Sequence, residues 1–360
     1  MMIRYSLAAA SVALTIAANA NATTIDDELK ALKDRIEQLE TQQQTKKTPP
    51  STPQEKQNSA IKLGGAVRVN YSYEDFNDAN ADRGGDFDFD LFRIDVSGHY
   101  EDLIYSAQYR WFEYMNVVHH AWIGYNFTEQ QQGKIGVTQV PFGILSYASN
   151  NYFFSSNFYL GLEDDYDMGL NYTYQSDKHR FDLAFYKNDE QGGLDGYVSN
   201  RTDRYSYDIV GVRLAGEDAY APPSDAYAAG EVNTFNLRYA HNLAFNKVEV
   251  ELGVSMQAGQ LEIQNGTEGD NRAAAIHSVI NYDRWNVKLQ MADYKYDVDG
   301  MDVDRMVVAA YHFYDSIPAE ATTYNANLAY SLPVDIGPIS NLTFYNDYSL
   351  VTDKPAALAD

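Results

Sequence analysis

The chain has 360 residues, of which 45% are hydrophobic, yet its mean hydropathy is only −0.45. This polarity excludes a bundle of membrane-spanning helices, since each helix would need about 20 consecutive apolar residues. Cysteine is absent, which excludes disulfides and thiolate metal sites, and the formal net charge of −24 disfavours binding to nucleic acid.

The first segment, Met1–Ala22, has the features of an export signal. Arg4 precedes an apolar run from Leu7 to Ala18, and Ala20-Asn21-Ala22 is a small-x-small cleavage site. We predict a cleaved signal peptide that exports the chain into the bacterial envelope. A buried N-terminal helix is the alternative, although nothing amphipathic supports it.

Residues 23–44 carry a heptad pattern. Its seam residues are spaced alternately by four and three positions: Ile25, Leu29, Leu32, Ile36 and Leu39. This spacing predicts a short coiled-coil helix, which is too short to be stable alone in water and therefore requires a partner. An amphipathic helix that docks on its own domain is the alternative. Residues 45–60, rich in Pro and Gln, predict an extended linker.

From residue 61 to residue 360 apolar residues recur at every second position. In one stripe, polar residues alternate with Val248, Val250, Leu252, Val254 and Met256. Such stripes place apolar side chains on one face of a strand and polar side chains on the other. We count about fifteen strands, separated by clusters rich in Asp, Gly and Asn. Short connections occur together with long ones, as in membrane barrels.

These features predict an all-β transmembrane antiparallel barrel of about 16 strands. A soluble sandwich is the alternative. The strands are close to the 9–11 residues that cross a bilayer at a tilt. Aromatic residues occur at stripe ends, where membrane interfaces are expected: Tyr71, Tyr73, Tyr100, Tyr172, Tyr174, Tyr294, Tyr296, Phe313 and Tyr314. Because single-chain bacterial barrels have an even strand number, we expect the closing strand or strands to be missing and the barrel to be C-terminally incomplete. A miscounted strand is the alternative.

One stretch resembles a known family. Gly133–Phe154 reads GKIGVTQVPFGILSYASNNYFF, in which a strand ending in GVTQVPFG leads into a loop rich in aromatic residues and Ser. This is similar to the phosphate-selective porins O and P, and the similarity extends over Phe87–Tyr174. It implies an outer-membrane homotrimer whose channel is narrowed by a loop that folds inward after Pro141.

Strand parity places seven basic residues on the predicted lumen side: Arg68, Arg93, Arg110, Lys134, Arg213, Arg238 and Lys288. These residues either form a path for anions or pair with Asp95, Asp182, Glu249 and Glu251. The candidate residues of the narrowing loop are Pro141, Phe142, Gly143, Glu163, Asp164, Asp165 and Asp167. Acidic residues at a constriction raise the barrier for anions. The sequence therefore favours a general or mildly charge-selective pore over a phosphate-specific channel.

Other motifs are weaker. The stretch Asp297–Asp304 resembles part of a calcium loop but lacks the spacing of an EF-hand. We interpret it as an acidic external turn that divalent ions bridge to lipopolysaccharide. His119 and His120 are adjacent, so in a regular strand they point to opposite faces and cannot share a metal. We predict neither a metal nor a cofactor.

We therefore predict an outer-membrane porin through which small hydrophilic solutes or ions diffuse passively, in contact with lipid and lipopolysaccharide. No nucleophile-elbow or phosphate-loop motif occurs, so we expect no enzymatic activity. Three alternatives remain open. They are an outer-membrane anchor or adhesin that binds a partner through acidic loops, a phosphate-specific anion channel, and a barrel hydrolase.

Overall fold

The computed structural model describes residues 59–151, 155–196, 198 and 200–358. The predicted signal peptide, the coiled-coil seam and almost all of the predicted linker lie outside these residues. The helical elements in the described part are all short: α2 (Asp78–Asp82), α3 (Ser156–Tyr159), η1 (Asp225–Tyr227) and η2 (Ala356–Leu358). Within that part of the chain, no helix is long and apolar enough to cross a bilayer.

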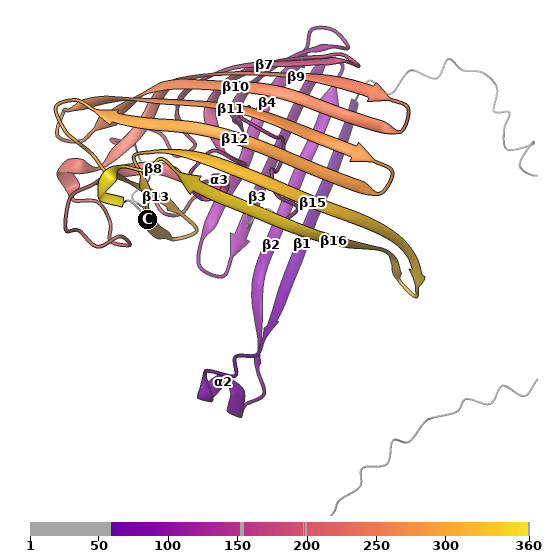
Figure 1. Ribbon diagram of the computed structural model, residues 1–360, viewed down its shortest axis with the longest axis horizontal. Coiled ribbons are helices and arrows are strands. Elements are labelled where there is room, and N and C mark those ends of the chain that lie inside the picture. The colour runs from indigo at the N-terminus through magenta and orange to yellow at the C-terminus, as the bar shows by residue number, and fades with distance from the viewer. Residues whose placement is uncertain (1–58, 152–154, 197, 199, 359–360) are drawn as a thin grey trace, which may run out of the picture. The chain divides into compact units, whose positions relative to one another are not determined.

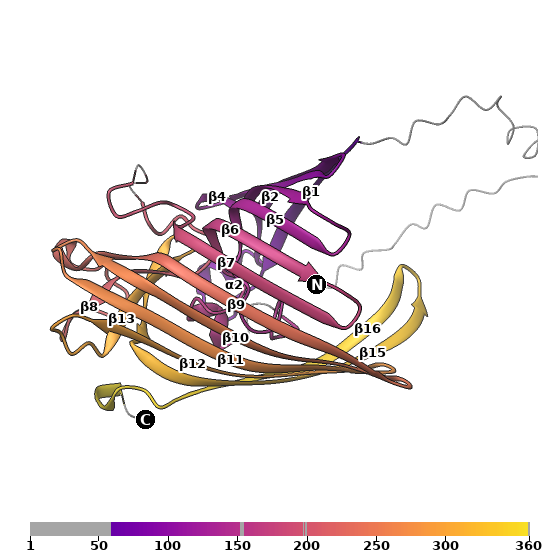
Figure 2. The same cartoon turned by 90° about the horizontal axis from the view of Figure 1, so that it is seen from above.

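Thirteen strands form one antiparallel sheet, which we call the wall (Figure 1). In sheet order they are β1 (Ser59–Ser72), β2 (Asp86–Tyr100), β3 (Leu103–Phe112), β4 (Asn116–Asn126), β5 (Gln131–Gln139), β6 (Tyr166–Gln175), β7 (His179–Asp189), β9 (Ala229–Phe245), β10 (Val248–Ile263), β11 (Glu268–Tyr282), β12 (Trp285–Val298), β15 (Glu320–Ile336) and β16 (Ile339–Thr352). Figure 2 shows that this sheet is strongly curved. In the residues described, no ladder joins the edge strands β1 and β16 to each other.

The other three strands form a separate inner sheet in the order β14-β13-β8. They are β8 (Asp208–Arg213), β13 (Arg305–Ala310) and β14 (Phe313–Pro318). The prediction of about sixteen strands is confirmed, but three of them are not in the wall. All six residues of β8 are buried. The sequence of a strand that is buried on both faces does not indicate which sheet the strand joins.

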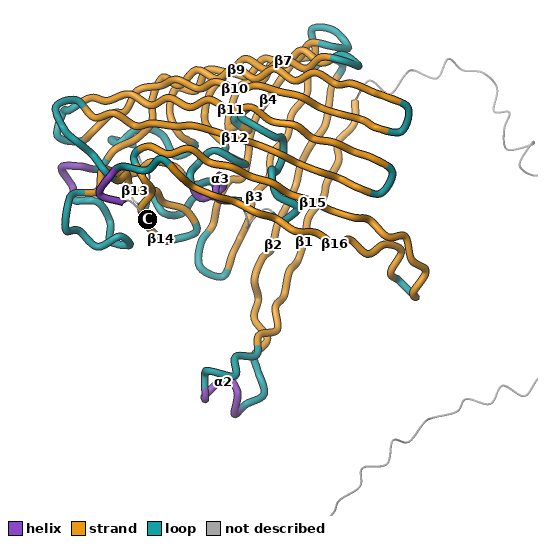
Figure 3. The backbone as a smooth tube through the Cα atoms, in the orientation of Figure 1, coloured by secondary structure: helices purple, strands orange, loops and turns teal. Residues whose placement is uncertain are grey.

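The connections differ between the two ends of the wall (Figure 3). At one end they are tight: Glu101-Asp102 joins β2 to β3, and Asn246-Lys247 joins β9 to β10. At the other end residues 140–165 join β5 to β6, and residues 190–207 join β7 to β8. Tight turns at one end and long loops at the other are typical of outer-membrane barrels, whose short turns face the periplasm.

The convex face of the wall carries a band of exposed apolar side chains. On β10 the band runs from Val248 to Ala258 and includes Leu252 and Met256, which are 46% and 61% exposed. These ten residue steps correspond to about 34 Å of strand, or about 24 Å of height at a 45° tilt. This height matches the apolar band of a transmembrane barrel, which is about 25 Å tall.

Beyond this band, toward the end with long loops, the polarity of the strands reverses. On β10, Glu262 is exposed on the convex face, while Leu261 and Ile263 on the concave face are 1% and 2% exposed. On β12, Tyr294 and Tyr296 are likewise buried, in one core with residues of the inner sheet. The prediction that these two tyrosines belong to an interfacial aromatic band is therefore wrong.

Candidate functional site

The connection between β5 and β6, residues 140–165, lies on the concave side of the wall, and we call it the β5–β6 segment. Its described parts are residues 140–151 and 155–165. Its ends are held together by a hydrogen bond from the backbone N–H of Val140 to the carbonyl of Asp165, 2.8 Å long. Gly143 has a φ of +60°, and a Cβ there would lie 2.5 Å from the side chain of Gln290. The predicted Pro-Phe-Gly motif thus turns the chain at a position that only glycine fits.

Inward-facing side chains of β9, β10 and β12 bind the start of this segment. The N–H of Gly143 donates to Ser255 Oγ at 3.0 Å, and the N–H of Ile144 donates to Gln290 Oε1 at 2.8 Å. Arg238 Nε donates to the carbonyl of Gly143 at 2.7 Å. Because all of these groups are buried, each bond satisfies a polar group that water cannot reach.

The middle of the segment is bound from β12 and β15. Lys288 Nζ donates to the carbonyls of Tyr147 and Ser149, at 3.1 and 2.9 Å. Asn327 Nδ2 donates to the carbonyl of Ala148 at 2.6 Å. Lys288 was predicted as a pore-lining charge, and in the structure its ammonium group binds the backbone of the segment.

Beyond this point the segment reaches the edge strand β16. The N–H and the Nδ2 of Asn150 donate to Asp347 Oδ1 at 3.0 and 2.8 Å. Ser155 Oγ donates to Asn325 Oδ1 of β15 at 3.1 Å. The segment therefore contacts five wall strands, β9, β10, β12, β15 and β16, which is possible because the wall curves around it.

The acidic residues at the end of the segment are buried rather than exposed to solvent. Glu163, Asp164 and Asp165 are 4%, 3% and 6% exposed. Burial raises the pKa of Glu163 to about 7 and that of Asp164 to about 6. Asp164 also accepts a hydrogen bond from the hydroxyl of Tyr205 at 2.6 Å. Burial and the nearby carboxyl of Asp208 raise the pKa of Asp165 well above its usual range.

Asp167 was predicted as part of the narrowing loop, but it is the second residue of β6 and lies on the concave face of the wall. It is 7% exposed. Loop and strand cannot be separated here from the sequence, because the acidic run continues from the segment into the strand without a break.

Six of the seven predicted basic residues lie in wall strands: Arg68 in β1, Arg93 in β2, Arg110 in β3, Lys134 in β5, Arg238 in β9 and Lys288 in β12. Arg213 instead lies in β8 of the inner sheet, where its guanidinium donates to the carbonyls of Ala219 and Ala221 at 3.2 and 2.6 Å. Parity placed it on the wall because alternation within a strand does not reveal which sheet the strand joins.

Carboxylates accompany most of the arginines on the concave face. Arg93 pairs with Asp95 at 3.0 Å along the same strand, and Arg238 pairs with Glu251 at 2.6 Å between β9 and β10. Arg68 pairs with Asp90. The side chains of Arg68 and Arg93 are 42% and 32% exposed. The concave face therefore offers solvent a mixture of both charges. Of the four carboxylates in the pairing alternative, three pair with predicted arginines in the residues described, namely Asp95, Asp182 and Glu251.

Some residues of this interior were missed by sequence reasoning. Arg180 pairs with Asp182 at 2.8 Å with its side chain 34% exposed, and parity could have found it. Arg204 lies fully buried in the loop between β7 and β8, where it pairs with Asp189 and Asp208 at 3.1 and 2.8 Å. A loop residue has no periodicity, so nothing in the sequence indicates this position.

The prediction for His119 and His120 is wrong. The register between β3 and β4 shifts at Gln108/Tyr109, and this irregularity breaks the alternation. The two Nδ1 atoms are 2.9 Å apart. His119 also packs against the ring of Tyr205, with the centroids 4.1 Å apart. Both rings therefore lie on the concave side, because a bulge adds one residue to the strand.

Comparison with known proteins gives fold likeness only. No family model matches the chain, so the resemblance to phosphate-selective porins gains no support from that comparison. No curated protein matches either. Among solved structures, the chain is similar to in-vitro folded OmpT, an outer membrane protein of Vibrio cholerae, with 11% identity, a TM-score of 0.40, and coverage of 84% of this chain and 90% of that one. It is also similar to OccK2 (OpdF) of Pseudomonas aeruginosa, solved with glucuronate, with 9% identity, a TM-score of 0.34, and coverage of 83% and 93%.

Proposed function

We propose that the protein is an outer-membrane porin that lets small hydrophilic solutes or ions diffuse through a water-filled channel. The single observation that carries this proposal is the division of the wall into an apolar convex band and a polar concave face. A soluble sandwich would cover the exposed apolar band with a second sheet. A membrane barrel turns such a band toward lipid.

Two shallow grooves on the convex face support this orientation. One, of about 700 Å³, is lined mainly by apolar residues of β9 to β15, among them Leu252, Ile276 and Met291. The other, of about 720 Å³, has Ile135, Leu170 and other apolar residues on its lining. Hydrocarbon chains fill such surfaces favourably, because they need no hydrogen-bonding partners.

The channel we propose is narrowed by the β5–β6 segment and is weakly charge-selective. The segment crosses the concave side and is bound to five wall strands, so it reduces the free cross-section. Its carboxyls are buried, and most of the partly exposed guanidiniums of the concave face have acidic partners. Neither sign of charge dominates, so we expect no phosphate specificity. A conducting form also requires paired edges at β1 and β16, since unpaired backbone groups in hydrocarbon cost several kcal/mol each.

Planar-bilayer recording of the purified protein tests this function. We expect stepwise conductance and a reversal potential close to zero in a gradient of potassium chloride. A strongly anion-selective current that inorganic phosphate blocks would contradict the weak selectivity and favour the phosphate channel. The predicted homotrimer is part of the proposal and is tested by native mass spectrometry in detergent.

One observation favours a second candidate, an anchor that binds a partner through acidic loops. The inner sheet and its core occupy the concave side at the end with long loops. On the same half of the wall, a groove of about 530 Å³ is lined in part by Asp195, Glu262, Glu268, Asp270 and Asp299. A protein that inserts into bilayers without conducting would support this candidate over the porin.

A further inference from the structure

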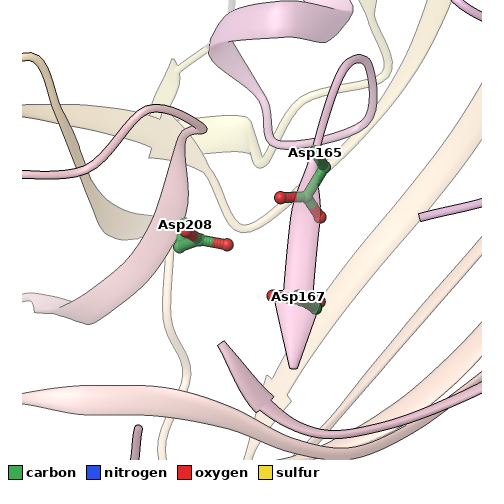
Figure 4. A group of neighbouring side chains, drawn as sticks. All are labelled: Asp165, Asp167 and Asp208. Atoms are coloured by element: carbon green, nitrogen blue, oxygen red, sulfur yellow. The ribbon is translucent and has the colours of Figure 1, made fainter. Parts of the chain in front are cut away.

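Three carboxylates converge where the β5–β6 segment, the wall and the inner sheet meet (Figure 4). Asp165 ends the segment, Asp167 belongs to β6, and Asp208 begins β8. We call these three residues the acidic cluster. One carboxylate oxygen from each lies within 4.8 Å of those of the other two. Oxygens that bind one Ca²⁺ at about 2.3–2.6 Å are at most about 5 Å apart, so a single ion can contact all three.

The acidic cluster is closed off from water. Asp165, Asp167 and Asp208 are 6%, 7% and 3% exposed. Oδ1 of Asp167 is buried and accepts no hydrogen bond from any described residue. Figure 4 shows the three side chains turned toward the space between them. A buried carboxylate oxygen without a partner is unfavourable unless a cation or a proton neutralises it.

The neighbouring basic residues do not supply the missing charge. Arg204 pairs with Asp189 at 3.1 Å and with Asp208 at 2.8 Å, and Arg201 pairs with Asp189 at 2.6 Å. In the part of the chain that the structure describes, no Lys, Arg or His forms an ion pair with Asp165 or Asp167. The two positive charges of Arg201 and Arg204 are thus balanced by the two negative charges of Asp189 and Asp208. The negative charges of Asp165 and Asp167 are left without a compensating side chain among the residues described.

We propose that the acidic cluster binds one Ca²⁺. The donors are all oxygens, which hard divalent cations prefer, and Ca²⁺ accepts irregular geometry whereas Mg²⁺ requires a near-ideal octahedron. The bound ion ties the end of the segment to the wall and to the inner sheet. This inference holds whether or not the protein conducts, because it concerns the fold on the concave side.

Binding and stability measurements on the whole protein in detergent test the site. After treatment with a chelator, we expect one tightly bound Ca²⁺ per chain by isothermal titration calorimetry, and a higher unfolding temperature with Ca²⁺ than with EDTA. Asp165→Asn and Asp208→Asn should weaken Ca²⁺ binding by more than about 100-fold and remove the effect of EDTA. The matched control Asp177→Asn changes an exposed carboxylate in the turn between β6 and β7, and it should bind Ca²⁺ like the unaltered protein.

Unchanged Ca²⁺ binding in both cluster variants would overturn the proposal. So would an unfolding temperature of the unaltered protein that is the same in Ca²⁺ and in EDTA. If an equimolar amount of Mg²⁺ displaces half of the bound Ca²⁺, the two ions bind equally well and the choice of metal is overturned. If the cluster variants do not fold, crystals of the unaltered protein soaked in Tb³⁺ decide the question. An anomalous peak between the three carboxylates supports the site, and its absence refutes it.

Discussion

Replacing Arg238 with Met should weaken the attachment of the β5–β6 segment to the wall and lower the stability of the protein. Arg238 is 1% exposed, donates to the carbonyl of Gly143, and pairs with Glu251 at 2.6 Å. Its guanidinium also lies 3.8 Å from Asp182, whose side chain is 1% exposed. Removing one partner of a buried ion pair costs about 3–5 kcal/mol. Because the side chain of Glu251 is 27% exposed, we take the lower end, about 3 kcal/mol.

This loss corresponds to a decrease of about 4 °C in the unfolding temperature, since an unfolding entropy of about 2.1 cal/mol/K per residue makes 1 kcal/mol worth about 1.3 °C in a chain of 360 residues. Thermal unfolding in detergent, followed by tryptophan fluorescence, measures it. Arg93→Met is the matched control, because its guanidinium pairs with Asp95 at 3.0 Å and both side chains are partly exposed, at 32% and 26%. We expect that variant to lose less than about 1 kcal/mol. Equal unfolding temperatures for the two variants would refute the role assigned to Arg238.

Three further predictions concern other parts of the wall. Lys288→Met removes the ammonium group that binds two carbonyls of the β5–β6 segment, so the current noise in single-channel recordings should increase. The control is Lys295→Met, which should leave the recordings unchanged because the ammonium group of Lys295 pairs with Asp297 and Glu320 and not with the described residues of the segment. Leu252→Arg in the middle of the apolar band should reduce insertion into vesicles at a cost of about 2–4 kcal/mol, whereas Gln260→Arg beyond the band should insert normally. Gly253→Ala places a Cβ 2.2 Å from an imidazole on β11 and should lower stability by about 1–3 kcal/mol in urea unfolding.

The wall could be predicted from the sequence because its strands have two chemically different faces. The stripe from Val248 to Met256 and the polar residues between its members place β10 correctly, as the exposed fractions show. The inner sheet could not be predicted in the same way. The residues of β8 and β13 are buried almost throughout, so their patterns fit a wall strand as well as an internal one.

The candidate site could be predicted only in part. The Pro-Phe-Gly motif indicates the start of the β5–β6 segment, because a glycine shortly after a strand is a local signal for a turn. The positive φ of Gly143 in the structure agrees with this signal. The bonds from Arg238, Lys288 and Asn327 to the segment join residues far apart in the sequence. Such contacts depend on how the sheet curves, which a single sequence does not encode locally.

The polarity of β10 and β12 reverses along their length, which explains why the same alternation of apolar and polar residues indicates two different environments in this protein. Between Val248 and Ala258 the apolar members of the stripe face outward, and beyond Gln260 they face inward. The physical cause is a change of surroundings on both sides of the same strand. In the orientation that we propose, hydrocarbon lies outside the first part, whereas water lies outside the second part. The inner sheet lies inside that second part. Between bulges, parity therefore fixes which residues share a face, and the height along the strand decides what that face contacts.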